Sequence, residues 1–171
     1  MVEFLKQNVV WQYTGQRPGT VNAGGKMRPF PKPTKKPKGV QKSLPQLKKM
    51  LQRLINKYVR LRDASKPCIS CMTRQVEHAG HFIAQGASGA LRFNEKNENG
   101  QCSQCNVWKR GNLILYRINL VKRIGEDEVK ELESHIFDVK KWTRIELLDM
   151  IDEYKLKIKD IENSLPNREN E

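Results

Sequence analysis

Apolar residues recur at helical spacing over positions 43–63, three or four residues apart, with lysine, arginine and glutamine on the other side. Ser43 suits an N-cap and Pro45 fits the first turn. The helix should end near Asp63, because the residue before Pro67 avoids the α region. The pattern therefore predicts an amphipathic, basic helix whose basic face either follows phosphates or is only solvated.

The C-terminal part of the chain shows the same period. One helix is predicted from about residue 113 until Gly125, and the next opens with the acidic run at 126–128. A long third helix follows the capping-box pattern at 143–146. Its apolar seam at 147–161 is most simply packed on the body of the protein, although a dimer seam remains open.

Between these helical segments the chain is rich in turns. Residues 75–83 are predicted to be extended, so that His81 and Ile83 share one face of a strand. Trp108 and Trp142 are assigned to the core rather than to base stacking. The predicted fold class is α+β and mainly helical.

The N-terminal region has an unusual composition. Residues 15–39 hold five of the eight prolines and five glycines, which predicts a flexible basic arm over residues 1–40. Residues 1–66 carry sixteen lysines and arginines but two acidic residues, whereas the whole chain has a net charge of +13. Such a block attracts a polyanion, most simply nucleic acid, although a solvated tail is the alternative. No amphipathic pattern precedes residue 43, which argues against a membrane surface.

All four cysteines form two C-x-x-C pairs, Cys68/Cys71 and Cys102/Cys105. Each pair can close a tight knuckle, and two knuckles supply the four thiolates of a structural Zn²⁺ site. The alternatives are two disulfides or a redox pair. The N-terminus has no secretory apolar segment, and two matched pairs leave no single active pair. The spacing therefore predicts zinc and a cytoplasmic protein.

The same stretch carries groups suited to phosphodiester hydrolysis, which needs an activated water and a Lewis acid on the phosphate. A neutral imidazole on a strand is a good base near neutral pH, so His81 is the candidate base. Asn97 and Asn106 are candidate oxygen ligands or orienting groups for Mg²⁺ or Mn²⁺. Lys109 and Arg110 either grip phosphate or are plain surface charge.

Two levels of resemblance follow from these residues. The elements Gly80-His81-Phe82, Asn94-x-x-Asn97, Cys102-x-x-Cys105-Asn106 and Lys109 resemble the HNH, or ββα-metal, nuclease motif. The wider text PCISC…AGHF…LRFNEKN…QC..CN..K.GNL..YR..L..RIG, followed by a Trp-Thr helix, is similar to the NinG (Rap) recombination proteins of lambdoid phages. The resemblance implies a small zinc-clamped HNH-like module flanked by helices, in a phage-encoded protein of the bacterial host cell.

The resemblance also implies an activity. It points to a structure-specific endonuclease that cuts branched recombination intermediates, such as D-loops and Holliday junctions. His81 would be the general base, Asn106 would help to hold the catalytic Mg²⁺ or Mn²⁺, and Asn97 would position the base or its loop. Arg92 would contact phosphate or pair with an acid.

One departure from the motif concerns the second ligand of the catalytic ion. Many HNH nucleases carry aspartate directly before the base, and this chain has Gly80 there. His78 or Glu77 would have to supply the missing ligand. His78 and His81 cannot share one strand face at this odd spacing unless a bulge or turn intervenes.

The predicted organisation is a basic arm at 1–40, a basic amphipathic helix at 41–66, the four-cysteine nuclease module at 67–125 and C-terminal helices at 126–171. The expected partners are branched DNA, phage recombination proteins and a second copy of the chain. The alternative function is a non-catalytic, zinc-containing DNA-binding accessory protein of recombination.

Overall fold

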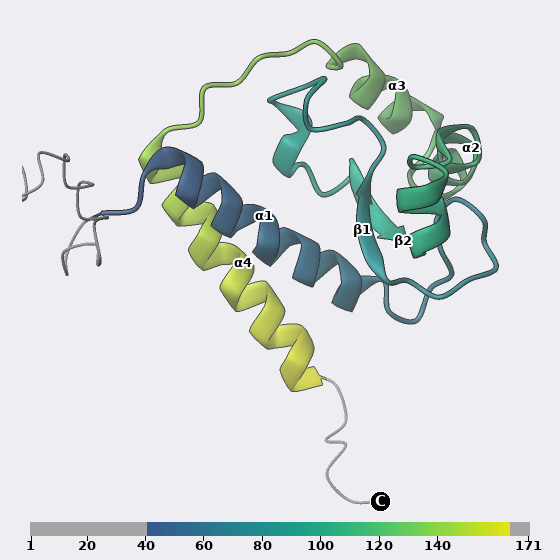
Figure 1. The fold of residues 1–171 in the computed structure, drawn as a ribbon, viewed down its shortest axis with the longest axis horizontal. Coiled ribbons are helices and arrows are strands. Elements are labelled where there is room, and N and C mark those ends of the chain that lie inside the picture. The colour runs from purple at the N-terminus through teal and green to yellow at the C-terminus, as the bar shows by residue number, and fades with distance from the viewer. Residues whose placement is uncertain (1–40, 165–171) are drawn as a thin grey trace, which may run out of the picture. The chain divides into compact units, whose positions relative to one another are not determined.

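The computed structural model describes residues 41–164, so the predicted arm at 1–40 and the tail after Ser164 lie outside the described residues. The helices are α1 (Leu44–Arg62), α2 (Leu113–Ile124), α3 (Glu126–Ser134) and α4 (Arg144–Ser164), with a 3-10 turn at Leu91–Phe93 and a π-helical turn at Gln104–Trp108 (Figure 1). The strands are β1 (His78–His81) and β2 (Glu98–Gln101). The described part is mainly helical, and none of its helices has the length and apolarity needed to cross a membrane.

Local signals in the sequence set the helix ends. Gln46 Oε1 accepts a hydrogen bond of 2.9 Å from the backbone N–H of Ser43, before α1. At the start of α4, the N–H of Thr143 donates to Glu146 Oε2 at 2.8 Å, and Thr143 Oγ1 accepts from the N–H of Glu146 at 3.3 Å. Gly125, with φ +93°, separates α2 from α3. The predicted starts and stops of these helices are confirmed.

Helices α1 and α4 lie side by side and run in the same direction (Figure 1). Arg144 donates to the carbonyl of Lys42 near their starts, at 2.8 Å, and Lys57 pairs with Glu162 near their ends, at 2.6 Å. Their buried side chains form one core: Leu47, Leu51, Ile55, Val59, Leu147, Ile151 and Tyr154. Each such side chain contributes about 2 kcal/mol on burial. The apolar seam of α4 therefore packs on the body of the protein, which is the simpler of the two predicted arrangements.

The two strands pair as an antiparallel hairpin. The register sets His78 opposite Gln101 and His81 opposite Glu98. Residues directly opposite one another point to the same side, and successive residues of a strand alternate. His81 and Glu98 therefore share one face of the hairpin, whereas Gly80 and Gln101 share the other.

Helix α1 covers the face that carries His81. Ala79 packs against the α1–α4 core, and the N–H of Gly100 donates to Asp63 Oδ2 at 2.9 Å. Asp63 ends α1 and is fully buried, with Arg62 at 2.8 Å and Arg123 at 3.5 Å from its Oδ2. Burial alone would raise the pKa of this carboxyl, but Arg62 and the Gly100 N–H lower the pKa to about 2. The ionised carboxylate of Asp63 therefore binds the Gly100 N–H of β2 at the end of α1.

The opposite face meets α2 and the cysteine knuckles. The hydroxyl of Tyr116, a fully buried residue of α2, donates to the carbonyl of Gly80 at 2.8 Å and accepts from Asn99 Nδ2 at 3.1 Å. A second core joins this region to α3: Ile69, Phe82, Ile83, Leu91, Tyr116, Leu120, Val129 and Leu132. The hairpin is thus held between two separate apolar cores.

The two tryptophans that were predicted to lie in the core differ in how far they are buried. Trp142 is half-buried, its ring lies edge-on to Phe93 at 5.1 Å between centroids, and its Nε1 donates to the carbonyl of Gly89 at 3.0 Å. Trp108 is 82 % exposed, so its core assignment is wrong. The π-helical turn directs Cys105 inward to the knuckle, and the residues just after it face solvent.

Candidate metal centre and catalytic site

The two C-x-x-C pairs converge on one point. The Sγ atoms of Cys68, Cys71, Cys102 and Cys105 all lie within 4.8 Å of one another, and all four thiols are free. The Sγ atoms of Cys71 and Cys102 are 3.9 Å apart. Zinc–sulfur bonds of about 2.3 Å in a tetrahedron impose a separation of about 3.8 Å. The donor set therefore fits a metal such as structural zinc.

Neighbouring groups donate to these sulfurs. Thr73 Oγ1 donates to Cys71 Sγ at 3.4 Å, and Asn112 Nδ2 donates to Cys105 Sγ at 3.5 Å. Partial burial by itself raises the pKa of the Cys71 thiol, but the hydroxyl and N–H of Thr73 outweigh it and lower the pKa to about 6. Such donors stabilise the thiolate form that a metal requires.

His81 lies at the end of β1, and its side chain is 10 % exposed. Its Nε2 is 3.1 Å from the carbonyl oxygen of Arg92. A carbonyl can only accept, so Nε2 carries the hydrogen and Nδ1 holds the lone pair of the neutral ring. Burial lowers the pKa of His81, which keeps the ring neutral near pH 7. The side chain is therefore in the protonation state that a general base needs.

Glu98 is the second titratable group on this face, and the sequence analysis did not single it out. It is fully buried, and its Oε2 lies 3.2 Å from His81 Nε2. Burial raises the pKa of Glu98 to about 7, against a hydrogen bond of 3.1 Å from Gln52 Nε2 and the charge of Arg62. Burial therefore disfavours the charged form of both side chains of the pair.

Asn97 is fully buried and binds the loop that follows β1. Its Oδ1 accepts from the N–H of Ile83 at 2.8 Å, and its Nδ2 donates to the carbonyls of Ile83 and Leu91 at 3.0 and 3.1 Å. These hydrogen bonds hold Ile83 and Leu91, the two ends of the loop before Arg92, close together. They fix the oxygen that orients His81, so the contacts of Asn97 are those of a positioning residue.

Asn106 follows Cys105 in the π-helical turn and lies beside Gly80. A Cβ atom added to Gly80 would be 3.0 Å from Asn106 Oδ1. Because His81 is the next residue of the strand, its side chain and that of Asn106 lie against opposite faces of the hairpin. The structure therefore does not bring the two predicted catalytic residues onto one face.

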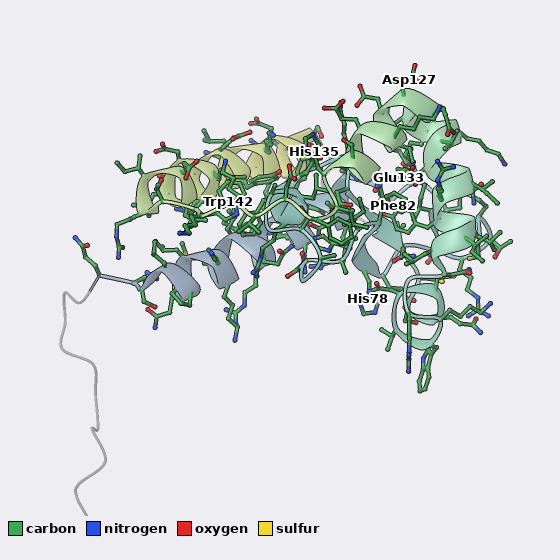
Figure 2. The ribbon with its side chains drawn as sticks, turned by 90° about the horizontal axis from the view of Figure 1, so that it is seen from above. His78, Phe82, Asp127, Glu133, His135 and Trp142 are labelled. Atoms are coloured by element: carbon green, nitrogen blue, oxygen red, sulfur yellow. The ribbon has the colours of Figure 1, made fainter. Side chains whose placement is uncertain are left out.

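His78 lies on the Gly80 face of the hairpin, opposite Gln101 on β2. The regular register confirms that His78 and His81 do not share a face. The third histidine, His135, ends α3 and is well separated from His78 in Figure 2. Among the described residues, the partners of His135 are Asp138, 2.7 Å from its Nδ1, and Glu131, 3.6 Å from its Nε2.

The three candidate DNA contacts lie in different settings. Lys109 and Arg110 are exposed just after the π-helical turn, beside the exposed ring of Trp108. The guanidinium of Arg92 lies 5.2 Å from the ring centre of Phe93, and its buried Nε has no hydrogen-bond partner within residues 41–164. The guanidinium of Arg92 therefore has an N–H donor that is not used by the described residues.

A groove of about 670 Å³ runs between α1 and Arg92. Its polar lining consists of cations and amides: Lys48, Lys49, Arg53, Arg92, Gln52 and Asn56. Within residues 41–164, no carboxylate lines it. Gln52 lines the groove and also donates to Glu98 Oε2, so its side chain contacts both the groove and the Glu98–His81 pair. Four cations in a concave surface without acidic residues suit a phosphate backbone.

Fold and site together define a class: a mainly helical protein with a small two-stranded hairpin and a four-cysteine centre that fits a metal such as zinc. The family model described as "Bacteriophage Lambda NinG protein" matches residues 31–164. The chain therefore belongs to the NinG family of bacteriophages, as its sequence motifs indicated.

Individual relatives agree with this assignment. Protein ninG of Escherichia phage lambda is 42 % identical over 118 residues, which cover 68 % of this chain and 57 % of that protein. Protein ninG of Salmonella phage P22 is 42 % identical over 120 residues, covering 68 % of this chain and 58 % of the relative. The chain thus spans less than two thirds of the length of these relatives. No solved structure matches the chain.

Proposed function

We propose that this chain is a metal-dependent endonuclease that hydrolyses phosphodiesters in branched DNA, such as D-loops and Holliday junctions. The observation that carries the proposal is the imidazole of His81, held neutral by burial and oriented through Nε2 by the carbonyl of Arg92. The family assignment and the order strand, strand, short helix around the cysteines are consistent with the HNH-like motif read from the sequence.

In this proposal, His81 Nδ1 accepts the proton of the attacking water. Asn106 would hold the catalytic Mg²⁺ or Mn²⁺ through a hard amide oxygen. That ion would supply a Lewis acid for the scissile phosphate and stabilise the leaving oxygen.

DNA binding is assigned to two surfaces. The groove with Lys48, Lys49, Arg53 and Arg92 provides sequence-independent phosphate contacts. Lys109, Arg110 and the exposed ring of Trp108 form a second surface beside the cysteine centre. Branched DNA exposes base pairs at the branch point, and an aromatic ring can stack on them. These surfaces support a preference for branched over linear duplex.

The test is an assay of the zinc-loaded full chain with and without Mn²⁺, on a linear duplex, a fork, a D-loop and a four-way junction. We expect cleavage of branched substrates that requires Mn²⁺ or Mg²⁺. His81→Ala should lower the rate by about 10²–10⁴-fold while zinc content and DNA binding remain. Unchanged cleavage by this variant would remove His81 from the mechanism.

A second candidate function is a non-catalytic DNA-binding accessory protein of recombination. The observation that favours it is that His81 Nε2 is already satisfied by Arg92 and Glu98, as in an ordinary buried histidine. This alternative predicts salt-sensitive binding to junctions and no metal-dependent product from the pure protein. The same assay decides between the two.

A further inference from the structure

The face of the hairpin opposite His81 contains a buried oxygen without a hydrogen-bond donor. Gln101 is fully buried, and its Oε1 has no hydrogen-bond partner in the described part of the chain. Leaving a buried carbonyl oxygen unpaired costs about 1–3 kcal/mol. Such an exception calls for a specific explanation, and a bound cation is one of the few that apply.

The hydrogen bonds made by Nε2 determine the orientation of the Gln101 amide. Nε2 donates to Ser70 Oγ at 2.6 Å and to the carbonyl oxygen of Gly111 at 2.7 Å. Ser70 Oγ in turn donates to the same carbonyl at 3.1 Å. If the amide were turned over, two carbonyl oxygens would face each other, which is repulsive. Oε1 is therefore held toward Gly80.

Gly80 leaves room for this oxygen. A Cβ atom built on Gly80 would lie 1.8 Å from Gln101 Oε1 and 3.0 Å from Asn106 Oδ1. The two amide oxygens therefore border the volume that a side chain at position 80 would occupy. Within residues 41–164 the Asn106 side chain makes no hydrogen bond, so its amide is free to present Oδ1 to a cation at this position. Two hard oxygen acceptors that converge without a donor suit Mg²⁺ or Mn²⁺.

We propose that Gln101 Oε1 and Asn106 Oδ1 together bind the divalent ion, with Gln101 as the ligand that Gly80 cannot provide. This assignment deepens the proposed nuclease function and rests on it. A side chain at position 80 and the present position of Gln101 exclude each other sterically, so the glycine and the glutamine are two parts of one arrangement.

The two ligands considered from the sequence fit less well. Glu77 is exposed, and its Oε2 is already engaged by the N–H of Ser103 at 2.7 Å. His78 shares the face with Gln101 but has an imidazole nitrogen, which Mg²⁺ binds poorly compared with oxygen. Neutral amides bind the ion weakly alone, and a DNA phosphate would complete the coordination and balance the charge.

A local probe of Mn²⁺ tests this assignment without any measurement of cleavage. Substoichiometric Mn²⁺ is added to the ¹⁵N-labelled, zinc-loaded full chain, and paramagnetic broadening of the side-chain amide signals is recorded. We expect the NH₂ signals of Gln101 and Asn106 to broaden at lower Mn²⁺ concentrations than other side-chain amides. Broadening confined to other side-chain amides, with these two signals intact, would overturn the assignment.

Variants separate a ligand from a structural residue. Gln101→Met keeps the size of the side chain and removes the oxygen, and it should weaken Mn²⁺ binding at Asn106 by at least about tenfold. Ser70→Ala is the matched control, because it removes one hydrogen bond of Nε2 and leaves Oε1 in place. It should bind Mn²⁺ like the parent chain. Equal loss in both variants, or none in Gln101→Met, would contradict the proposal.

A ligand exchange gives a positive test. Gly80→Asp alone should clash with Gln101 and bind Mn²⁺ weakly, whereas Gly80→Asp combined with Gln101→Ala opens that space for a carboxylate beside Asn106. The double variant should recover Mn²⁺ binding relative to Gln101→Ala. A double variant that binds no better than Gln101→Ala would argue against a shared ion position.

The ion site and the nuclease function can fail separately in these experiments. If Mn²⁺ binds at Gln101 but no branched substrate is cut, the ion site stands and the nuclease proposal fails. If DNA is cut and Gln101→Met cuts and binds Mn²⁺ normally, the nuclease proposal stands and the role of Gln101 fails.

Discussion

The two faces of the β1–β2 hairpin are built from different chemistry. The face toward α1 carries His81 and Glu98, two buried titratable groups whose charges burial disfavours. The face toward the knuckles carries Gln101, and Asn106 of the π-helical turn lies against it. Both side chains are amides, which do not titrate. Because neighbouring residues of a strand point to opposite sides, one short strand can present a proton acceptor and border an ion site without placing them in contact.

This separation has a physical benefit for the proposed reaction. A divalent ion close to an imidazole would lower its pKa and compete for its lone pair. The strand would lie between the proposed ion and His81, which is oriented by the carbonyl of Arg92. The knuckle face adjoins the cysteine centre that could bind a metal, whereas the α1 face packs against the apolar α1–α4 core. If the two faces are independent, a substitution on one should leave the stability of the other unchanged.

The largest effect is expected from loss of the cysteine centre. Cys105→Ala should abolish stoichiometric zinc and remove several kcal/mol of stability, since structural zinc binding contributes about 10 kcal/mol in small domains. Zinc content by mass spectrometry and amide hydrogen exchange measure the result. Exchange protection should fall in the π-helical turn and α2 while the α1–α4 core stays protected.

Asn112→Ala is the control for that experiment, because it removes a hydrogen bond to Cys105 Sγ but no ligand. It should keep zinc and most of the protection in α2. Simultaneous loss of protection in α1 and α4 in the Cys105→Ala variant would show that the two faces unfold as one unit.

An intermediate effect is expected from the Glu98 carboxyl on the α1 face. Its pKa of about 7 in the folded chain lies above the usual 4.5, so the native state binds the proton more tightly than the unfolded state. The stabilising contribution is therefore complete below pH 4.5 and is lost as the pH rises through about 7. Between these limits the parent chain should lose about 3 kcal/mol relative to Glu98→Gln.

Denaturant unfolding of both proteins from pH 4.5 to 8 measures this difference. Asp160→Asn is the control, because the Asp160 side chain is exposed on α4. Its stability should follow that of the parent chain at every pH. A constant difference between Glu98→Gln and the parent chain across the range would show that the carboxyl group of Glu98 has no raised pKa.

The smallest effect is expected from Trp108, on the outer side of the knuckle module. If its ring stacks on a base pair at a branch point, Trp108→Ala should reduce the preference for a four-way junction over a linear duplex by about 1–3 kcal/mol. Competition binding with the two DNAs measures the preference. Val107→Ala, a neighbour that is 56 % exposed, should leave it unchanged. Equal effects of both substitutions would argue against stacking.

Several features could be read from the sequence because their causes are local. The ends of α1, α2 and α4 follow from Ser43, Gly125 and Thr143, whose capping bonds span three or four residues. The four-cysteine centre follows from the C-x-x-C spacing, which closes each knuckle within one turn. Odd spacing also sufficed to predict that His78 and His81 lie on different faces.

Other features depended on contacts between distant segments. Glu98 looked like an ordinary polar residue beside Asn97, and only its burial under Gln52 of α1 made it a partner of His81. Gln101 became a candidate ligand because Ser70, thirty-one residues earlier, holds its amide nitrogen. Trp108 was misassigned because an apolar side chain alone does not reveal which way the cysteine-bearing turn directs it.

The amino-acid sequence alone determined the periodicity of the helices, the donor atoms of the cysteine centre and the family to which the chain belongs. Tertiary structure decided which side of the hairpin each candidate residue occupies and which buried polar atom lacks a partner. The reason is that helix capping and knuckle closure depend on residues a few positions apart. The pKa of a carboxyl group or the satisfaction of an amide oxygen depends on what the rest of the chain packs against it.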